Sequence, residues 1–264
     1  MPTSLAIFGA TGRMGRRLVA LAHADPELTV VAAIASPGGK HLGTDAGELA
    51  GIGPIGIPIT VVLDASVLVD CAIDFSTPAG TAAAVKACVA RKIPLVVATT
   101  GHDPHEKQEI ESAAHETAIL LSPNTSLVVN LLFKLSQITG EVLAGKGFDV
   151  EIIERHHRHK KDSPSGTATQ FARIIQQEMG QLNLQHGREG LLGERPLAEI
   201  GIHAVRAGDN VGEHTIIFAA PGETLELVHK GTSRDSYARG ALMAALFLAG
   251  KGAGRYTMAD VLGL

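Results

Sequence analysis

Short apolar stretches alternate with amphipathic segments through the first half of the chain. Residues 4–8 and 29–35 are apolar runs, and residues 14–24 between them place apolar side chains at helical spacing. This order predicts two parallel strands joined by a helix in a right-handed crossover. The same alternation predicts further strands at 71–75, 95–98 and 118–121 and further helices at 78–91 and 103–116. Such an alternation is typical of an α/β fold with a doubly wound parallel sheet.

The pattern changes after residue 124. A long helix is expected at 127–144, and the apolar runs beyond it follow one another with few helices between them. The expected elements are strands at 150–154, 201–206, 215–219 and 225–228, helices at 167–179 and 236–249, and a surface loop at 181–195. This order of elements predicts a second, α+β domain built on an antiparallel or mixed sheet. We therefore expect one domain from residues 1–126 with 237–264 and another from residues 127–236.

The composition narrows the range of partners. Of 264 residues 45% are hydrophobic, and 23 Lys and Arg against 27 Asp and Glu give a net charge of −4, which argues against nucleic acid and anionic membranes as partners. The apolar runs are too short to span a membrane, and no export signal precedes the first strand. Cys71 and Cys88 lack the spacing of a disulfide framework or metal site. We expect a cytoplasmic protein with inert thiols, which argues against an enzyme that needs a cysteine nucleophile, such as a semialdehyde dehydrogenase.

A glycine-rich turn lies between the first predicted strand and helix. Its residues are Gly9, Ala10, Thr11, Gly12, Arg13, Met14 and Gly15. Glycines at such a turn let the backbone approach a pyrophosphate, which the following helix N-terminus favours, and Arg13 can add a contact. Thr11 replaces the second glycine of the usual G-x-G-x-x-G pattern, and an ordinary glycine turn is the alternative. The strand, turn and helix context favours a Rossmann-like dinucleotide site formed by residues 9–14.

Three further segments bear on the cofactor. The second strand ends at Ser36 and Pro37, where an acidic residue commonly holds the adenosine ribose, so NADPH or NADH should be accepted, with Lys40 available to a 2′-phosphate. Two other segments follow predicted strands and are expected to flank the nicotinamide, although simple loop capping is an alternative. Their residues are Ala98, Thr99 and Thr100 in the first, and Ser122, Pro123, Asn124 and Thr125 in the second.

The densest chemical signal is the basic segment at residues 151–168. It carries three histidines and four cations, which are Arg155, His156, His157, Arg158, His159, Lys160 and Lys161. Mutual repulsion and burial both lower the pKa of histidines and lysines in such a cluster, which suits acid/base catalysis. Ser165 is a good N-cap for the next helix, so the N–H groups of Gly166 and Thr167 form an anion site. Together they indicate a small anionic substrate, and a carboxylate rather than a phosphate because no cluster of metal-binding carboxylates accompanies them.

Three alternatives compete for this segment: a solvated basic loop, a zinc site and an RNA-contacting patch. Neighbouring Lys and Arg raise the cost of binding a dication, so we expect no metal. RNA binding favours interleaved aromatic residues or a wider basic surface, and aromatic residues make up only 3% of the chain. The catalytic interpretation is therefore preferred, and the remaining histidines are expected to be surface or structural residues.

Several of these motifs occur together in one family. The glycine turn at 9–15, the segments at 74–76, 98–101, 156–160 and 162–168, and the later segments at 206–215 and 229–234 resemble the 4-hydroxy-tetrahydrodipicolinate reductases. The resemblance covers nearly the whole chain, and the histidine–lysine loop followed by Pro-Ser-Gly-Thr is its most specific part.

The resemblance implies a function and roles for the candidate residues. It implies a Rossmann-like cofactor domain, a second domain that binds substrate and assembles a homotetramer, and reduction of a cyclic dicarboxylate by NADH or NADPH with loss of water, in the diaminopimelate route to lysine. By the same resemblance His156 is the acid/base residue and Lys160 the proton donor. His157 contacts the substrate, and Gly166 with Thr167 binds one of its carboxylates.

The sequence departs from the family at two places. Ser36 and Pro37 replace an acidic and basic pair, which leaves the preference between NADH and NADPH open. Thr125 stands where an aromatic residue is frequent and Val128 where a glycine is usual, so the contact with the nicotinamide is expected to differ. Two other functions stay open: a redox sensor or scaffold that binds the dinucleotide without turnover, and a reductase of the same architecture acting on another carboxylate.

Overall fold

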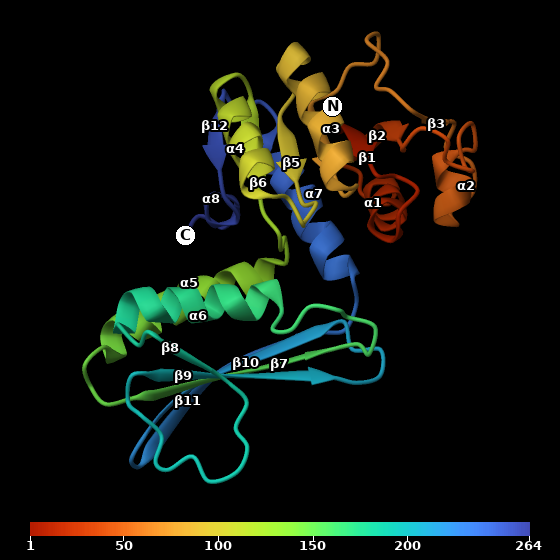
Figure 1. Ribbon diagram of the computed structural model, residues 1–264. Helices are drawn as coiled ribbons and strands as arrows, with labels where there is room; N and C mark the ends of the chain where they lie inside the picture. Colours follow the sequence, from red (N-terminus) through yellow and green to blue (C-terminus); the bar gives the residue numbers. More distant parts are fainter. The chain divides into compact units, whose positions relative to one another are not determined.

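The computed structural model describes residues 1–264, which form two compact units. Unit 1 contains Met1–Leu127 and Asp235–Leu264, and unit 2 contains Val128–Arg234. The chain therefore builds most of unit 1, then all of unit 2, and returns to unit 1 with its last 30 residues (Figure 1).

Unit 1 is built on a sheet of seven parallel strands, in the order β12-β6-β5-β4-β1-β2-β3. Its strands are β1 (Thr3–Phe8), β2 (Leu28–Ile34), β3 (Ile59–Thr60), β4 (Cys71–Asp74), β5 (Leu95–Val97), β6 (Ala118–Leu121) and β12 (Gly254–Tyr256). The strand order reverses at β1, which has β2 on one side and β4 on the other. This arrangement confirms the predicted doubly wound sheet and places the glycine turn at the switch point, where such folds bind ligands.

Helices cover both faces of this sheet because alternate side chains of each strand point to opposite sides. On one face Leu5 and Ile7 of β1 pack with α1 (Arg13–His23) and α7 (Asp235–Leu248). On the other face Ala6 and Phe8 pack with α3 (Pro78–Arg91) and α4 (Pro104–Ser112). As expected for a proline at the first helical position, Thr77 caps α3 by accepting a hydrogen bond from Gly80 N–H.

Several short elements of unit 1 were not predicted. They are α2 (Ala46–Ala50), β3, β12, α8 (Met258–Leu262) and the 3₁₀ turn η1 (Ala113–His115), which ends the helix expected at 103–116 early. The segment around α2 is organised by the Asp45 carboxylate, which accepts hydrogen bonds from five backbone N–H groups between residues 47 and 57. Elements of this length have no hydrophobic period to detect, and the two short helices α2 and α8 are instead capped by the side chains of Asp45 and Thr257.

Unit 2 is a mixed five-stranded sheet, in the order β11-β10-β7-β9-β8. Its strands are β7 (Asp149–His156), β8 (Asn183–His186), β9 (Glu199–Arg206), β10 (Gly212–Ala220) and β11 (Glu223–Gly231). The two long helices α5 (Leu127–Leu143) and α6 (Gly166–Met179) lie on one face (Figure 1). Phe171 and Ile175 of α6 pack there against alternate strand residues such as Ile152 and Ile216. The predicted α+β domain with a mixed sheet is confirmed.

The prediction of a surface loop at 181–195 is partly wrong. Residues 183–186 form β8, which pairs in parallel with β9 at the edge of the sheet. Its side chains are exposed or half-buried, so the sequence has no alternation of apolar and polar residues to reveal a strand.

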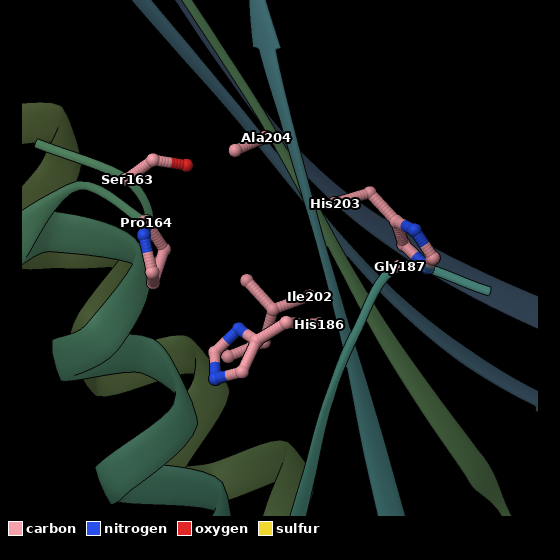
Figure 2. Close-up of a pocket in the computed structure, with 7 residues that line it drawn as sticks. All are labelled: Ser163, Pro164, His186, Gly187, Ile202, His203 and Ala204. Atoms are coloured by element: carbon pink, nitrogen blue, oxygen red, sulfur yellow. The ribbon is translucent and has the colours of Figure 1, made fainter. Parts of the chain in front are cut away.

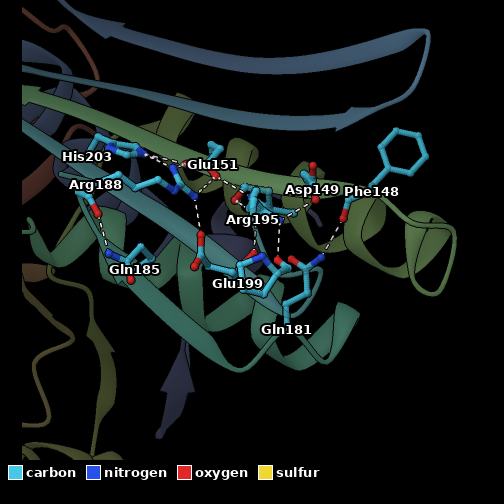
Figure 3. Close-up of polar contacts among 12 residues, drawn as sticks. Phe148, Asp149, Glu151, Gln181, Gln185, Arg188, Arg195, Glu199 and His203 are labelled. Atoms are coloured by element: carbon cyan, nitrogen blue, oxygen red, sulfur yellow. Dashed lines mark hydrogen bonds and ion pairs between the residues drawn. The ribbon is translucent and has the colours of Figure 1, made fainter. Parts of the chain in front are cut away.

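A network of charges joins the rest of this segment to the sheet face that points away from α5 and α6 (Figure 3). Arg188 donates to Glu151 at 2.6 and 3.0 Å and to Glu199 at 2.5 Å. Arg195 donates to Glu151 at 2.9 Å and to Asp149 at 2.6 Å. Burial alone would raise the pKa of Glu151, but the hydrogen bonds from Arg188, His203 and Arg195 outweigh it and lower that pKa to about 2.

Candidate active site

The glycine turn after β1 is packed too tightly for any larger residue. Gly9 has a φ of 77°, and a Cβ there would lie 2.3 Å from the Phe75 carbonyl oxygen. A Cβ on Gly15 would lie 2.2 Å from the Gly9 carbonyl oxygen. The turn is fixed further by the N–H groups of Gly9 and Ala10, which both donate to the Ile34 carbonyl at 2.9 and 3.0 Å. The glycines are therefore needed for the path of the backbone itself.

The start of α1 suits an anionic group. Gly12 is the N-cap and offers no side-chain acceptor to the first N–H groups of the helix, and the first turn contains no acidic residue. Arg13 is exposed beside it. Unpaired N–H groups and the helix dipole favour a phosphate at this position. The residues present thus fit the pyrophosphate of a dinucleotide.

The end of β2 has no carboxylate that would repel a 2′-phosphate. Ser36 and Pro37 follow the buried residues Ile34 and Ala35 and are exposed, and so is Lys40.

Asp74, at the end of β4, is wholly buried and organises the neighbouring loops. Its Oδ1 accepts from Ser76 Oγ at 2.5 Å, and its Oδ2 accepts from Thr81 Oγ1 at 2.6 Å and Thr99 Oγ1 at 2.8 Å. Thr99 Oγ1 in turn accepts from Ser76 N–H at 2.8 Å. These bonds join the loop after β5 to the turn after β4, and that turn packs against Gly9. Asp74 was part of a recognised motif, but its sequence position alone gave it no role.

The loop after β6 is also tightly bonded. Ser122 Oγ donates to the Asn124 carbonyl at 2.8 Å, and Asn124 Oδ1 accepts from Ser126 N–H at 2.9 Å. The Thr125 hydroxyl donates to the Tyr237 carbonyl at 2.7 Å, so its proton serves to hold α7. Of the residues expected to flank the nicotinamide, Thr100 and Pro123 are exposed, and Ala98, Thr99, Ser122, Asn124 and Thr125 are buried.

The second group of candidates is centred on the end of β7. His156 is the last residue of this strand, is 8% exposed, and donates from Nδ1 to Glu154 Oε2 at 2.5 Å. The loop that follows carries Lys160, whose ammonium pairs with Asp162 at 2.9 Å. His157 has a buried Nδ1 without a hydrogen-bond partner.

The loop ends at the N-terminus of α6. Ser165 caps the helix, as predicted, by accepting from Ala168 N–H at 3.2 Å. Gly166 is exposed, open space surrounds the position that a Cβ would take, and the first turn of α6 has no acidic residue. The helix start therefore offers N–H groups to an anion. Unit 2 thus brings together the predicted residues His156, His157, Lys160, Gly166 and Thr167 around one short loop.

Two histidines that sequence reasoning treated as surface or structural residues lie beside His156. His214 of β10 packs edge-on against it, with ring centroids 5.4 Å apart, and stacks on His229 of β11 at 5.7 Å. Burial, followed by the charges of His156 and His229, lowers the pKa of His214 to about 3. The pKa of His229 and that of His157 are also lowered, mainly by burial. His214 and His229 occupy paired positions on antiparallel strands. Their proximity can be recognised only when the register of these strands is known.

A cavity of about 440 Å³ lies close to the loop, at the edge of the same sheet (Figure 2). Its lining residues are Ser163, Pro164, His186, Gly187, Ile202, His203 and Ala204. It shares Ser163 and Pro164 with the loop but contains none of the predicted catalytic residues.

Other reactive groups offer little to the site. Burial raises the pKa of the Cys71 thiol well above its usual range and that of Cys88 to about 12, so neither is a nucleophile. No three His, Cys, Asp or Glu side chains are grouped to hold a metal ion. None of the helices has the length and apolar character needed to cross a membrane.

Comparisons with known proteins confirm the resemblance seen in the motifs. Residues 3–125 match the family model described as dihydrodipicolinate reductase, N-terminus, and residues 128–262 match dihydrodipicolinate reductase, C-terminus. The 4-hydroxy-tetrahydrodipicolinate reductase of Rhodopirellula baltica is 48% identical, covering 100% of this chain and 97% of that protein. The enzyme of the same name from Methylococcus capsulatus is 46% identical, covering 98% and 97%.

A solved structure shares the fold. The dipicolinate-bound dihydrodipicolinate reductase from Paenisporosarcina sp. TG-14 superposes with a TM-score of 0.77 at 23% identity, covering 98% of this chain and 99% of that one. The family models together span nearly the whole sequence, and two relatives exceed 45% identity. This chain therefore belongs to the dihydrodipicolinate reductase family.

Proposed function

We propose that this protein reduces 4-hydroxy-tetrahydrodipicolinate to tetrahydrodipicolinate with NADPH or NADH and loss of water, in the diaminopimelate route to lysine. The proposal rests mainly on one observation. One short loop, in a chain that belongs to this reductase family, carries Lys160 and connects His156 to the start of α6. Relatives that share more than 40% of their residues with this chain carry the name of this activity.

Unit 1 holds the dinucleotide in this proposal. The backbone of residues 9–14 surrounds the pyrophosphate, Arg13 adds a direct contact, and Ser36 faces the adenosine ribose. The loops at 98–100 and 122–125 flank the nicotinamide ring, held in place by Asp74 and by the bonds of Asn124. A bound NAD(P)H supplies the hydride of the reaction.

Unit 2 binds the substrate and handles its protons. The N–H groups of Gly166 and Thr167 bind one carboxylate of the cyclic substrate, and His157 contributes a further contact. Lys160 donates the proton that balances the hydride, and His156 acts as the acid/base residue. The dicarboxylate also balances the positive charge of the loop. The dipicolinate bound to the neighbouring structure named above is a dicarboxylate of this kind.

The absence of an acidic residue after β2 leads to a proposal about the cofactor. With Ser36 and Pro37 at that position and Lys40 exposed nearby, NADPH should be used at least as well as NADH. Steady-state kcat/KM values for both cofactors test this. A strong preference for NADH in the native protein would contradict it, and Lys40→Ala should weaken NADPH alone.

We also propose a cytoplasmic homotetramer assembled through the sheet of unit 2. The face away from α5 and α6 carries the apolar side chains of Ile153, Ile217 and Val228, and Val228 is 43% exposed. Light scattering coupled to size-exclusion chromatography measures the assembly. A monomer at micromolar concentration would contradict the proposal.

The test of the reaction is the decay of nicotinamide absorbance with enzymatically generated 4-hydroxy-tetrahydrodipicolinate. We expect the native protein to oxidise NADPH and NADH, and Lys160→Ala to lower kcat by on the order of 100-fold. Lys161→Ala is the matched control, because Lys161 is the neighbouring exposed cation, and it should keep native activity.

Two outcomes would contradict the roles proposed for these residues. Full activity in His156→Ala would remove His156 from its acid/base role. If both cofactors bind but neither is consumed, the substrate assignment fails and a dinucleotide sensor becomes the better explanation.

A further inference from the structure

Glu154 is a wholly buried carboxylate that the proposed reaction does not use directly. It lies on β7 two residues before His156, so both side chains point to the same face of the sheet. That face is the one covered by α6, and Glu154 is enclosed between the sheet and the helix start. A carboxylate in such a place costs free energy unless every oxygen is paired.

The two oxygens of Glu154 are bonded to different parts of the site. Oε2 accepts from His156 Nδ1 at 2.5 Å and from Arg206 Nη1 at 2.7 Å. Oε1 accepts from Ser165 N–H at 2.9 Å and from Arg206 Nη2 at 2.7 Å. One side chain therefore contacts both the acid/base histidine and the N-cap of α6, where the substrate carboxylate is proposed to bind.

Arg206 completes the arrangement from β9. Its guanidinium holds Glu154 in a two-point pair, and Nη2 also donates to the Asp162 carbonyl at 2.7 Å. Asp162 belongs to the loop that carries Lys160 and is that residue's ion-pair partner. The pair of Glu154 and Arg206 thus connects the strand, the loop and the helix start, which are the three elements that present the proposed catalytic and binding groups.

We infer that Glu154, held by Arg206, is a positioning residue that fixes His156 in one orientation and tautomer relative to the anion site at the start of α6. The catalytic use of that orientation rests on the proposed function. The geometry on which it stands does not depend on the substrate.

The tautomer follows from the chemistry of the carboxylate. Burial alone would raise the pKa of Glu154, but the hydrogen bonds from His156, Arg206 and Ser165 N–H outweigh it and lower that pKa to about 2. An ionised carboxylate only accepts hydrogen bonds, so His156 Nδ1 carries a proton. In the neutral ring this leaves Nε2 unprotonated and available to accept or return a proton.

A contribution to stability does not by itself explain why Glu154 and Arg206 form a buried ion pair. A buried ion pair is often no more stabilising than apolar residues of the same volume, because desolvation offsets the attraction between the charges. An orientation role explains why the charges lie at this place. The other titratable groups around His156 are His214 and His229 of β10 and β11 and the loop residues His157 and Lys160.

The test is Glu154→Gln, with Glu151→Gln as a matched control. Glu151 lies on the same strand and, like Glu154, is bonded to arginine and histidine side chains, in its case Arg188, Arg195 and His203, but it points to the opposite face of the sheet. A glutamine at 154 can donate to Nδ1 and so favours the other tautomer. The ¹⁵N chemical shifts of the His156 ring, assigned by comparison with His156→Asn, report which nitrogen is protonated.

We expect the ring of His156 to carry its proton on Nδ1 in the native protein and in Glu151→Gln, and to lose that preference in Glu154→Gln. We expect kcat of Glu154→Gln to fall by about 10- to 100-fold, the size of loss seen when the hydrogen-bond partner that orients a metal-bound histidine is removed. KM should change less than kcat. If Glu154→Gln keeps the native tautomer and native kcat, the inference is wrong.

Folding and function are separated by two additional measurements. If Glu154→Gln alone does not fold, Glu154→Gln/Arg206→Met removes both charges together and should fold, again without the native tautomer. If the native protein does not oxidise NADPH but its His156 has the expected tautomer, the proposed function fails and the positioning role stands. If the native ring lacks the Nδ1 proton, the positioning role fails whatever the activity.

Discussion

Each unit of this protein buries one carboxylate completely, and the two are held in different ways. Asp74 in unit 1 is bonded to the hydroxyls of Ser76, Thr81 and Thr99, which are neutral donors. Glu154 in unit 2 is bonded to Arg206 and His156, which are cationic or can become so. Both carboxylates join the end of a strand to a neighbouring loop.

This difference in hydrogen-bond partners agrees with the function proposed for each unit. Unit 1 needs a fixed shape against which a pyrophosphate and a nicotinamide can lie, and backbone N–H groups with neutral bonds provide that. Unit 2 needs to move protons beside an anionic substrate, and charged partners such as Glu154 hold the side chains involved in place. The first site should therefore be sensitive to added volume, and the second to altered charge.

The largest effect is expected from added volume at the glycine turn. Gly15→Ala places a Cβ 2.2 Å from the Gly9 carbonyl oxygen, so the turn must open. We expect NADPH and NADH affinity to fall by about 100-fold or more, the equivalent of a clash of 2–3 kcal/mol. Calorimetric titration measures it, and Gly252→Ala is the control because open space surrounds that position. Native affinity in Gly15→Ala would show that the turn does not hold the dinucleotide.

A smaller effect, on stability, is expected when the hydroxyl network around Asp74 in unit 1 is altered. Asp74→Asn keeps the size of the side chain but replaces one acceptor oxygen by a donor, which faces hydroxyl donors already committed to this carboxylate. We expect the free energy of unfolding to fall by roughly 2 kcal/mol. Urea denaturation measures it, and Asp103→Asn, at the exposed cap of α4, should cost less than about 1 kcal/mol. Equal losses in the two variants would remove the special role of Asp74.

The charge sensitivity of unit 2 should appear as a dependence of stability on pH. His214 is neutral in the folded state because its pKa is lowered to about 3, whereas the unfolded chain takes up a proton near pH 6.5. Stability from this residue is complete above pH 6.5 and is lost as the pH falls towards 3, by about 2 kcal/mol between pH 6.5 and 5.

Substitution at this position isolates that contribution. His214→Phe cannot take up a proton, so its unfolding free energy should fall less between pH 6.5 and 5 than that of the native protein. His157 and His229, whose pKa values are also lowered, keep part of the slope. Urea denaturation at the two pH values gives the comparison, and an unchanged slope in His214→Phe would contradict the assignment.

The smallest effect is expected on the outer face of the same sheet. Arg188 pairs with Glu151 and Glu199, and its side chain is 33% exposed in the single chain, so solvent screens the attraction unless the proposed tetramer covers this part of the sheet. Arg188→Ala should cost less than about 1 kcal/mol of stability, and the loss should shrink further in high salt. Thermal denaturation at low and high ionic strength measures it. A loss independent of salt would indicate that packing, not charge, holds this segment.

Local signals explain what the sequence could predict. The glycine turn, the basic loop with Ser165 and the alternation of strands and helices all lie within a few residues of chain, so spacing and residue type suffice to recognise them. The predicted proximity of His156, Lys160 and Gly166 follows because Lys160 lies in one short loop and the other two residues lie at its ends.

Relations across the chain explain what the sequence could not predict. Arg206 lies 52 residues from Glu154, and it reaches the carboxylate only because β9 pairs with β7 in a particular register. The same holds for the stacked histidines on β10 and β11 and for Thr99 on Asp74, 25 residues away. Register depends on the whole fold, so no local pattern identifies these partners.

In the proposed substrate site, the N–H groups at the start of α6 bind an anionic ring compound beside His156. The most direct test compares the dissociation constant of dipicolinate in Gly166→Pro and Gly166→Ala. Ser165 has the extended backbone that a following proline requires, and the position is open, so both variants should fold. Gly166→Pro removes one N–H donor, whereas Gly166→Ala keeps it. We expect dipicolinate to bind at least about 10-fold more weakly to Gly166→Pro and with near-native affinity to Gly166→Ala, with NADPH affinity unchanged in both. Equal dipicolinate affinity in the two variants would contradict it.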